Sequence, residues 1–210
     1  MKKEKIILVL NGKLPKKADL YVFLKKYNKI VCADGATNQV IQSNIKPDLI
    51  MGDLDSIEKT ILEEYKKNVI GLINQNYNDF QKILFWLKKK KYKKLDIIGM
   101  EGKRIDHLIG NFNIVLKEVA NFDLTIFSEF GIFYTVQKKR IFKKCKKKYF
   151  SLFSFNKNNK ITTKGLKFKL DNKSLKSLEK GTLNFSNKDE VTIETEKNIL
   201  VFIANSDFKK

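Results

Sequence analysis

The chain has few of the residues that bind zinc or form disulfides. Cys32 and Cys145 are its only cysteines, they have no CxxC spacing, and His107 is its only histidine. The sequence therefore offers no His/Cys cluster for zinc. Two isolated cysteines favour reduced thiols, as in cytosolic proteins. We therefore expect a cytoplasmic location.

Long apolar runs are also missing. A membrane-spanning helix needs about 18 consecutive apolar residues, and no segment approaches that length. The apolar run at residues 6–10 is too short for the core of a signal peptide. It is better interpreted as a buried first strand. The sequence predicts a soluble protein without a membrane partner.

Arginine is scarce, although the chain is strongly basic. The formal net charge is +20, yet Arg104 and Arg140 are the only arginines. Lysines neutralise phosphates without reading a base sequence, whereas specific nucleic-acid readers favour the planar fork of arginine. We expect a solvated lysine surface and no specific nucleic-acid partner. A lysine-rich nucleic-acid-binding module is the alternative.

Apolar residues, in contrast, are plentiful. They make up 42% of 210 residues, enough for one large domain or two small ones. In the first part of the chain, short apolar runs alternate with helical patterns. The runs lie at residues 6–10, 30–33, 69–73, 95–98 and 124–127, and the helical patterns at 79–90 and 106–118. This alternation predicts an α/β domain with a mostly parallel sheet over residues 1–130.

The pattern changes after about residue 130. Strand-like runs are separated by clusters of Asn, Gly, Ser and Lys, and only a weak helical pattern is left, at residues 174–180. The runs lie at residues 133–136, 149–155, 164–170, 191–194 and 200–203. This pattern predicts a small antiparallel β domain over residues 131–210, with the boundary within residues 128–140.

Carboxylates follow the predicted strands, at the edge where open α/β sheets bind ligands. Asp34 begins an Asp-Gly turn after the second strand, and a simple Asx turn is the alternative. Asp53 and Asp55 follow a glycine and can converge on a hard cation such as Mg²⁺. A helix cap formed by Asp55 or Ser56 is the alternative there.

Two further clusters lie at predicted helix starts. Asp79 and Lys82 are three residues apart and share a helix face, after an N-cap at Asn78 or Asp79. They could meet a metal and a phosphate, or form a surface salt bridge. A loop with two glycines leads to a basic pair, Lys103 and Arg104, and such a loop with Arg at a helix start is typical of a phosphate site. His107 fits a nucleotide contact better than a general base.

The order of these clusters resembles the thiamine pyrophosphokinase family. The matching segments are Asp-Gly-Ala at 34–36, Gly-Asp-x-Asp-Ser at 52–56, Asp-Phe-x-Lys at 79–82 and Gly-x-x-Gly-x-Arg-x-Asp-His at 99–107. A Gly-Leu-Lys-aromatic segment within 162–170 and Ser-Asn at 186–187 extend the resemblance. The chain departs from the family's pattern at Asn78, Lys103, Phe168 and Lys169.

The resemblance implies a three-layer α/β domain followed by a β-sandwich. It also implies a homodimer, whose thiamine sites lie between the α/β domain of one subunit and the β domain of the other. The implied reaction transfers pyrophosphate from ATP to the thiamine hydroxyl, and AMP leaves.

The resemblance also assigns roles to residues. Mg²⁺ would be held by the catalytic aspartates Asp53, Asp55 and Asp79. The hydroxyl proton would be removed by Asp79 or through formation of a magnesium-activated alkoxide. The residues expected at the phosphates are Lys82 and Arg104, and those near the nucleotide are Asp34, Asp106 and His107. The candidate thiamine contacts are Gln75, Ser186, Asn187 and Phe168.

A second enzyme function stays open. A related two-domain kinase could act on a different hydroxymethyl substrate, and ADP instead of AMP as the product would exclude pyrophosphoryl transfer. The nucleic-acid-binding module would form no ATP-dependent product, and its binding would depend strongly on salt.

Overall fold

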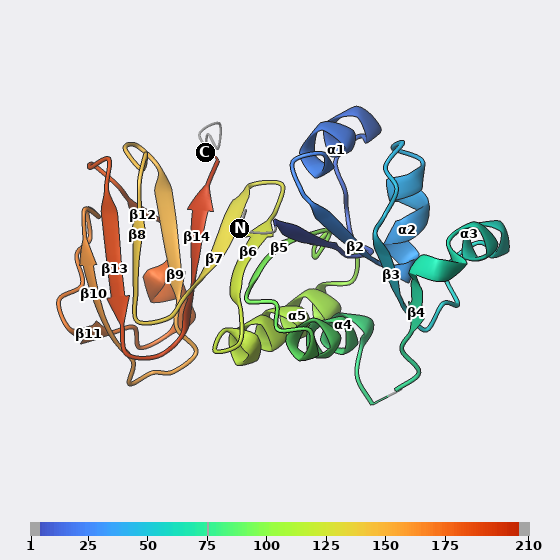
Figure 1. Ribbon diagram of the computed structural model, residues 1–210. Coiled ribbons are helices and arrows are strands. Elements are labelled where there is room, and N and C mark those ends of the chain that lie inside the picture. Colours follow the sequence, from blue (N-terminus) through green and yellow to red (C-terminus); the bar gives the residue numbers. More distant parts are fainter. Residues whose placement is uncertain (1–4, 75, 206–210) are drawn as a thin grey trace. The chain divides into compact units, whose positions relative to one another are not determined.

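The computed structural model describes residues 5–74 and 76–205. By their internal contacts the residues divide into two units, Met1–Ile114 and Val115–Lys210 (Figure 1). The predicted domain boundary lies further along the chain, within residues 128–140. The strand at residues 123–127 accounts for the difference, because it pairs with the strand that follows it. The division at residue 130 stays a prediction.

The first unit contains parallel strands in the order β5-β1-β2-β3-β4. They are β1 (Ile6–Val9), β2 (Lys29–Ala33), β3 (Leu49–Gly52), β4 (Val69–Gly71) and β5 (Lys94–Ile98). Every residue of β1 is buried, as are all but the first residues of β2 and β3. Burial of both faces explains why these strands are continuous apolar runs instead of alternating ones.

Helices connect the strands of this unit. They are α1 (Lys17–Leu24), α2 (Asp34–Ile41), α3 (Lys59–Glu64), the 3₁₀ helix η1 (Lys66–Asn68) and α4 (Asp79–Lys89). α5 (Ile105–Glu118) follows β5. From β1 to β4 each new strand is added on the same side of the previous one. The chain then passes through α4 to β5, which lies on the other side of β1. Right-handed crossovers therefore place α1 and α4 on opposite faces, as Figure 1 shows. The reversal of direction leaves a crevice beyond the carboxyl ends of β1 and β5.

The second unit contains two antiparallel layers of strands, in the orders β12-β9-β14-β7-β6 and β11-β10-β13-β8. The first layer consists of β6 (Asp123–Phe127), β7 (Gly131–Val136), β9 (Tyr149–Phe153), β12 (Asn184–Phe185) and β14 (Ile199–Ala204). The second consists of β8 (Lys139–Phe142), β10 (Lys160–Lys164), β11 (Lys173–Ser174) and β13 (Val191–Thr195).

One apolar core joins these two layers. It includes Phe150 and Val201 from the first layer, and Ile161 and Ile193 from the second, all fully buried. The residues of β13 alternate between buried and partly exposed positions, so one face of the strand meets the core. The second unit is a β-sandwich, and the predicted fold class is confirmed.

Two of the predicted segments in this unit are wrong. Residues 164–170 were expected to form a strand, but β10 ends at Lys164 and only an isolated bridge from Leu166 to Ser186 follows. Gly165 has φ +87, which interrupts an extended strand. The weak helical pattern at residues 174–180 gives only the 3₁₀ helix η2 (Leu178–Gly181).

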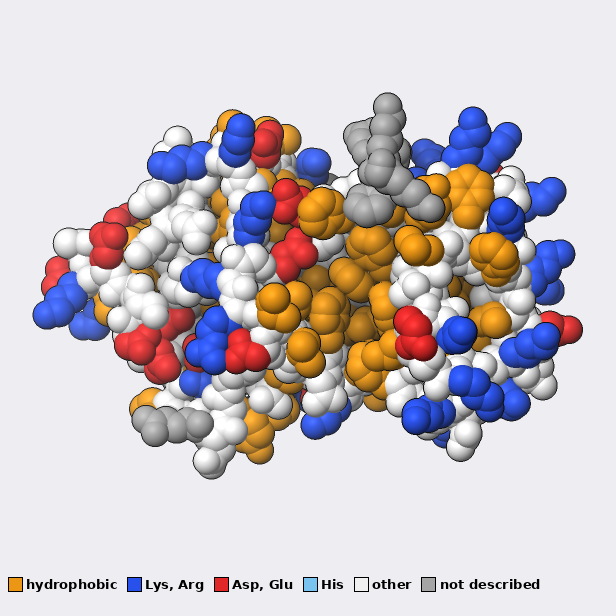
Figure 2. Space-filling model, turned by 180° about the vertical axis from the view of Figure 1, so that it is seen from behind, with side chains coloured by type: hydrophobic (Ala, Val, Ile, Leu, Met, Phe, Trp, Pro, Cys, Tyr) orange, Lys and Arg blue, Asp and Glu red, His pale blue; other side chains and the backbone are white. Residues whose placement is uncertain are grey.

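Charged and apolar side chains are mixed on the surface of the protein. On the face that Figure 2 shows, Lys and Arg side chains are spread among acidic and apolar ones. Residues 5–74 and 76–205 contain no helix with the length and apolarity that a membrane crossing requires.

Cys32 and Cys145 are buried free thiols, and burial raises the pKa of both, which disfavours thiolate chemistry.

Gly110→Ala should stabilise the protein. Gly110 lies inside α5, and a Cβ at this position would have no atom of the described residues within 4 Å apart from the chain neighbours and backbone of its own helix. Alanine restricts the unfolded chain, so we expect the free energy of unfolding to rise by about 0.5–1 kcal/mol. Urea denaturation of both proteins measures the change. A lower unfolding midpoint for the variant would contradict the open space around this residue.

Candidate active site

A cavity of about 770 Å³ lies in the first unit, at the carboxyl ends of the parallel strands. Each of the segments that follow β1 to β5 contributes to its lining. Examples, in chain order, are Asn11, Asp34, Asp53, Tyr77 and Lys103. The crevice expected from the strand order is therefore a real cavity.

Three aspartates form an acidic cluster in this region. Asp34, Asp53 and Asp55 each offer a carboxylate oxygen, and these oxygens lie within 4.8 Å of one another. Asp34 is buried, whereas the other two are exposed. Carboxylate oxygens are the hard ligands that Mg²⁺ prefers, and a few are enough when phosphates supply the rest. The donor set fits the expected magnesium ion, with Asp34 added to Asp53 and Asp55.

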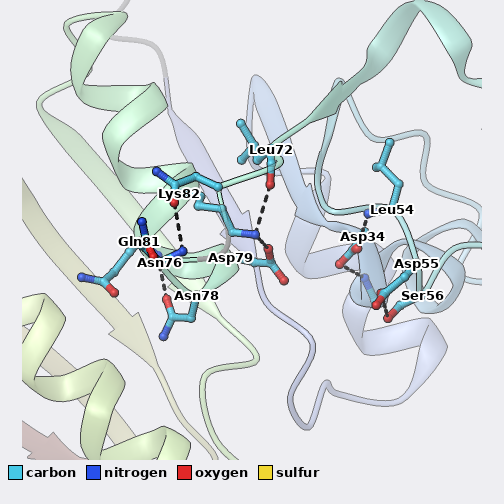
Figure 3. Close-up of polar contacts among 12 residues, drawn as sticks. Asp34, Leu54, Asp55, Ser56, Leu72, Asn76, Asn78, Asp79, Gln81 and Lys82 are labelled. Carbon is cyan, nitrogen blue, oxygen red and sulfur yellow. Dashed lines mark hydrogen bonds and ion pairs between the residues drawn. The ribbon is translucent and has the colours of Figure 1, made fainter.

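The carboxylate of Asp34 is held by backbone groups. It accepts hydrogen bonds from the backbone N–H of Gly35 at 2.6 Å and of Leu54 at 2.9 Å (Figure 3). Gly52 leaves room for it, because a Cβ there would lie 2.5 Å from its Cγ. Backbone N–H groups at the start of α2 and in the loop after β3 therefore fix the position of the Asp34 carboxylate, whose oxygens could bind a metal ion.

The cluster carries concentrated negative charge. Burial raises the pKa of Asp34, the charges of Asp79 and Asp53 raise it further, and the two backbone hydrogen bonds oppose the rise. For Asp53, burial alone would raise the pKa. Hydrogen bonds with Asp55 and Asp34 and the positive charge of Lys82 outweigh it, so the pKa of Asp53 is lowered. A cation bound here would relieve the repulsion among these carboxylates.

Asp79 and Lys82 form an ion pair at the start of α4. Lys82 Nζ lies 2.6 Å from Asp79 Oδ1 and donates a hydrogen bond to the Leu72 carbonyl at 3.1 Å (Figure 3). Lys82 is only 8% exposed. Within the described part of the chain, Asp79 Oδ1 is buried and has this ion pair but no well-aligned hydrogen bond. The prediction that the two side chains share a helix face is confirmed.

Asn78→Ala should lower stability, because Asn78 caps α4. Its Oδ1 accepts a hydrogen bond from the backbone N–H of Gln81 at 2.9 Å. Loss of this bond should reduce the free energy of unfolding by about 1 kcal/mol in thermal or urea denaturation. Asn78→Ser keeps a capping oxygen and serves as the control. Equal losses in the two variants would contradict a capping role.

Arg104, Asp106 and His107 lie at the start of α5. Arg104 and His107 line the cavity. Arg104 donates two hydrogen bonds to Asp106, at 3.1 and 2.6 Å, and both side chains are exposed. The Arg104 hydrogen bond lowers the pKa of Asp106 to about 2. The guanidinium is therefore engaged with Asp106 in this conformation.

The alternative of a helix cap at residues 55–56 is wrong. The residue before α3 is Glu58, and in the described part of the chain no side chain caps this helix. Ser56 Oγ donates instead to Asp55 Oδ1 at 2.8 Å.

Comparisons with known proteins agree with the resemblance. The family model "Thiamin pyrophosphokinase, catalytic domain" matches residues 20–127. The model "Thiamin pyrophosphokinase, substrate-binding domain" matches residues 131–202.

The chain belongs to the thiamin pyrophosphokinase family.

Individual members of this family are distant relatives. Thiamine pyrophosphokinase 1 of Oryza sativa is 26% identical over 148 residues, which cover 59% of this chain and 55% of that protein. The chain therefore spans about half the length of the plant relatives that it matches. Thiamine pyrophosphokinase of Bacillus subtilis is 24% identical over 205 residues, or 90% of this chain and 92% of that protein.

A solved structure has the same fold. The crystal structure of thiamine pyrophosphokinase from Bacillus subtilis superposes with a TM-score of 0.79. The superposition covers 98% of this chain and 100% of that one, at 23% sequence identity.

The predicted thiamine contacts of this family member lie mostly in the second unit. Ser186 is fully buried, and its hydroxyl lies within hydrogen-bonding distance of the Gly165 and Lys188 carbonyls. Asn187 is exposed. Phe168 is 63% exposed, so it is not a core residue. Gln75 lies outside the described residues. The thiamine contacts stay predictions.

Two loops that line the cavity contain residues to which the sequence assigned no role. Asn11 and Gly12 lie on the loop after β1, and Lys103 lies between β5 and α5. The rule that located Asp34 and Asp53 would also have located Asn11, because it too follows an apolar run. Lys103 belongs to the basic pair of the predicted phosphate loop, but only Arg104 of that pair was assigned to the phosphates.

Proposed function

We propose that this chain transfers pyrophosphate from ATP to thiamine, giving thiamine diphosphate and AMP. The observation that carries the proposal is the cluster of Asp34, Asp53 and Asp55 within 4.8 Å. It lies beside the cavity that the Asp79–Lys82 ion pair lines, in a chain of the thiamin pyrophosphokinase family. Carboxylates for a cation and ammonium groups for phosphates are the groups that phosphoryl-transfer sites require.

In the proposed reaction, the thiamine hydroxyl oxygen forms a bond to the β-phosphorus of ATP. The bond between this phosphorus and the α,β-bridging oxygen breaks, and AMP leaves with the electron pair. The hydroxyl proton passes to the Asp79 carboxylate, or to water if a bound magnesium ion would favour the alkoxide. A bound magnesium ion would neutralise phosphate charge that builds up during transfer. We propose Asp53, Asp55 and Asp79 as its ligands, joined by Asp34.

The remaining residues bind and orient the nucleotide. Lys82 is held by the Leu72 carbonyl and by Asp79, so its ammonium has a fixed position in the cavity wall. Fixed charges stabilise a transition state without reorganising during the reaction. Arg104 and His107 lie in the same wall, and Arg104 would exchange Asp106 for a phosphate.

The remaining expectations extend this proposal. We propose that Ser186, Asn187 and Phe168 contact thiamine in a cytoplasmic homodimer. Phe168 supports the assignment by its exposure, because an exposed ring is available for stacking.

The proposal is tested by incubating the full chain with ATP, Mg²⁺ and thiamine. We expect equal amounts of AMP and thiamine diphosphate, both measured by chromatography. ADP as the product would identify an ordinary kinase instead. The absence of any nucleotide product, together with salt-sensitive binding of RNA or DNA, would favour the nucleic-acid-binding alternative.

A further inference from the structure

Lys103 is a cation of the cavity that the proposed reaction has not used. It lies on the loop between β5 and α5, and its side chain lines the cavity. Its Nζ donates a hydrogen bond to Asn11 Oδ1, on the loop after β1, at 2.8 Å. The two side chains therefore meet at the crevice where the strand order reverses.

Close backbone contacts hold the two loops together. Gly102 has φ +92, a conformation that favours glycine, and a Cβ there would lie 2.2 Å from the Cβ of Lys13. The backbone N–H of Lys13 donates to the Glu101 carbonyl at 2.6 Å. A Cβ on Gly12 would lie 2.2 Å from the same carbonyl oxygen. The backbone position of Lys103 next to the cavity is therefore fixed by its neighbours.

Lys103 has a different kind of partner from the other cations in the cavity wall. Lys82 is paired with Asp79 and Arg104 with Asp106, each at 2.6 Å. The hydrogen-bond partner of Lys103 is a neutral amide. An amide oxygen accepts a hydrogen bond without neutralising the ammonium, so an anion would be the stronger acceptor. Among residues 5–74 and 76–205, exchange of Asn11 for a phosphate oxygen would break no ion pair of Lys103.

We propose that Lys103 binds a phosphate group of the nucleotide, and that Asn11 holds its ammonium at the cavity beforehand. This inference rests on the proposed function, because ATP is the source of the phosphate. The three acidic groups of the cluster repel a polyphosphate unless cations offset them. Lys103 adds positive charge without displacing an existing carboxylate contact.

The test compares Lys103→Gln and Lys103→Arg with the wild-type chain. Calorimetry measures the dissociation constants of ATP and of adenosine, both with Mg²⁺, and steady-state assays measure KM for ATP. We expect Lys103→Gln to raise both the dissociation constant and KM for ATP roughly ten-fold, as for a lost charged hydrogen bond. Binding of adenosine, which has no phosphate, should not change, and Lys103→Arg should keep most of the ATP affinity.

Lys89→Gln is the matched control, since it removes one exposed lysine at the end of α4, outside the cavity. Its ATP affinity should match the wild-type value. Unchanged ATP affinity in Lys103→Gln, or an equal loss for ATP and adenosine, would overturn the inference. A wild-type chain that binds ATP but forms no AMP refutes the proposed function alone, and the comparison of ATP with adenosine still decides the role of Lys103. A wild-type chain that binds no ATP refutes both.

Discussion

Asp53→Asn should nearly abolish AMP formation while the protein stays folded. Asp53 follows β3, is exposed, and shares the acidic cluster with Asp34 and Asp55. The amide keeps the size of the side chain but removes its charge, and a charged metal ligand contributes several kcal/mol to transition-state stabilisation. We expect kcat/KM for thiamine and ATP to fall roughly a thousand-fold.

Thermal denaturation separates loss of function from loss of fold in this variant. Because Asp53 is exposed, its melting temperature should stay close to the wild-type value. Asp19→Asn in α1 removes an exposed carboxylate from the same unit and should keep full activity. Near-normal turnover by Asp53→Asn would refute the assignment of Asp53 to the metal.

Gly52→Ala should cause the second large loss of activity. The new methyl group would lie 2.5 Å from the Cγ of Asp34, so the carboxylate must move by about 1 Å to reach an ordinary contact distance. Asp34 would then lose the hydrogen bond from Leu54 and its place beside Asp53. Displacement of a catalytic group by about 1 Å costs roughly a hundred-fold in rate. The assay is again AMP formation at saturating Mg²⁺.

Gly71→Ala is the matched control for this variant. Gly71 is the register partner of Gly52 in the neighbouring strand β4. Apart from its chain neighbours, a Cβ at Gly71 would meet only Leu54 Cδ1 among the described residues, at an ordinary 3.7 Å. We expect Gly71→Ala to keep most of its activity. Equal activity in the two alanine variants would show that the position of Asp34 does not matter for turnover.

Much of the first unit could be predicted from the sequence, because its signals are local. Buried parallel strands are short apolar runs, and α4 has apolar residues at helical spacing after a capping residue, Asn78. The same local rules placed Asp53 and Asp79 near a ligand site. β3 (Leu49–Gly52) is not predicted as a strand, because it is short and continues into an acidic motif.

The composition of the metal cluster could not be predicted in this way. Asp34 joins Asp53 and Asp55 because β2 and β3 pair in parallel with Ala33 opposite Met51. That register is a property of two segments separated in the chain, and no single segment encodes it. The prediction therefore separated Asp34, as a neighbour of the nucleotide, from the metal ligands.

The second unit was harder to predict, since its strands carry lysines. β8 (Lys139–Phe142) and β10 (Lys160–Lys164) each have few apolar residues, and neither is predicted from the sequence. β10 has one buried face and one polar face, whereas β8 exposes Ile141, so neither short strand gives a strong apolar signal. Conversely, residues 164–170 contain enough apolar residues for a strand, but the backbone conformation of Gly165 prevents it.

The position of β14 has a consequence for how the second unit forms during synthesis. This strand, Ile199–Ala204, comes after all the other strands in chain order, yet it lies between β7 and β9. Until β14 has been synthesised, β7 and β9 each have one edge whose backbone N–H and C=O groups lack the partner strand. Such edges can pair with other chains. The first layer of the sandwich is completed in its middle, and only after the other described strands have been made. A nascent chain of this protein therefore depends longest on protection from aggregation in the layer that contains β14.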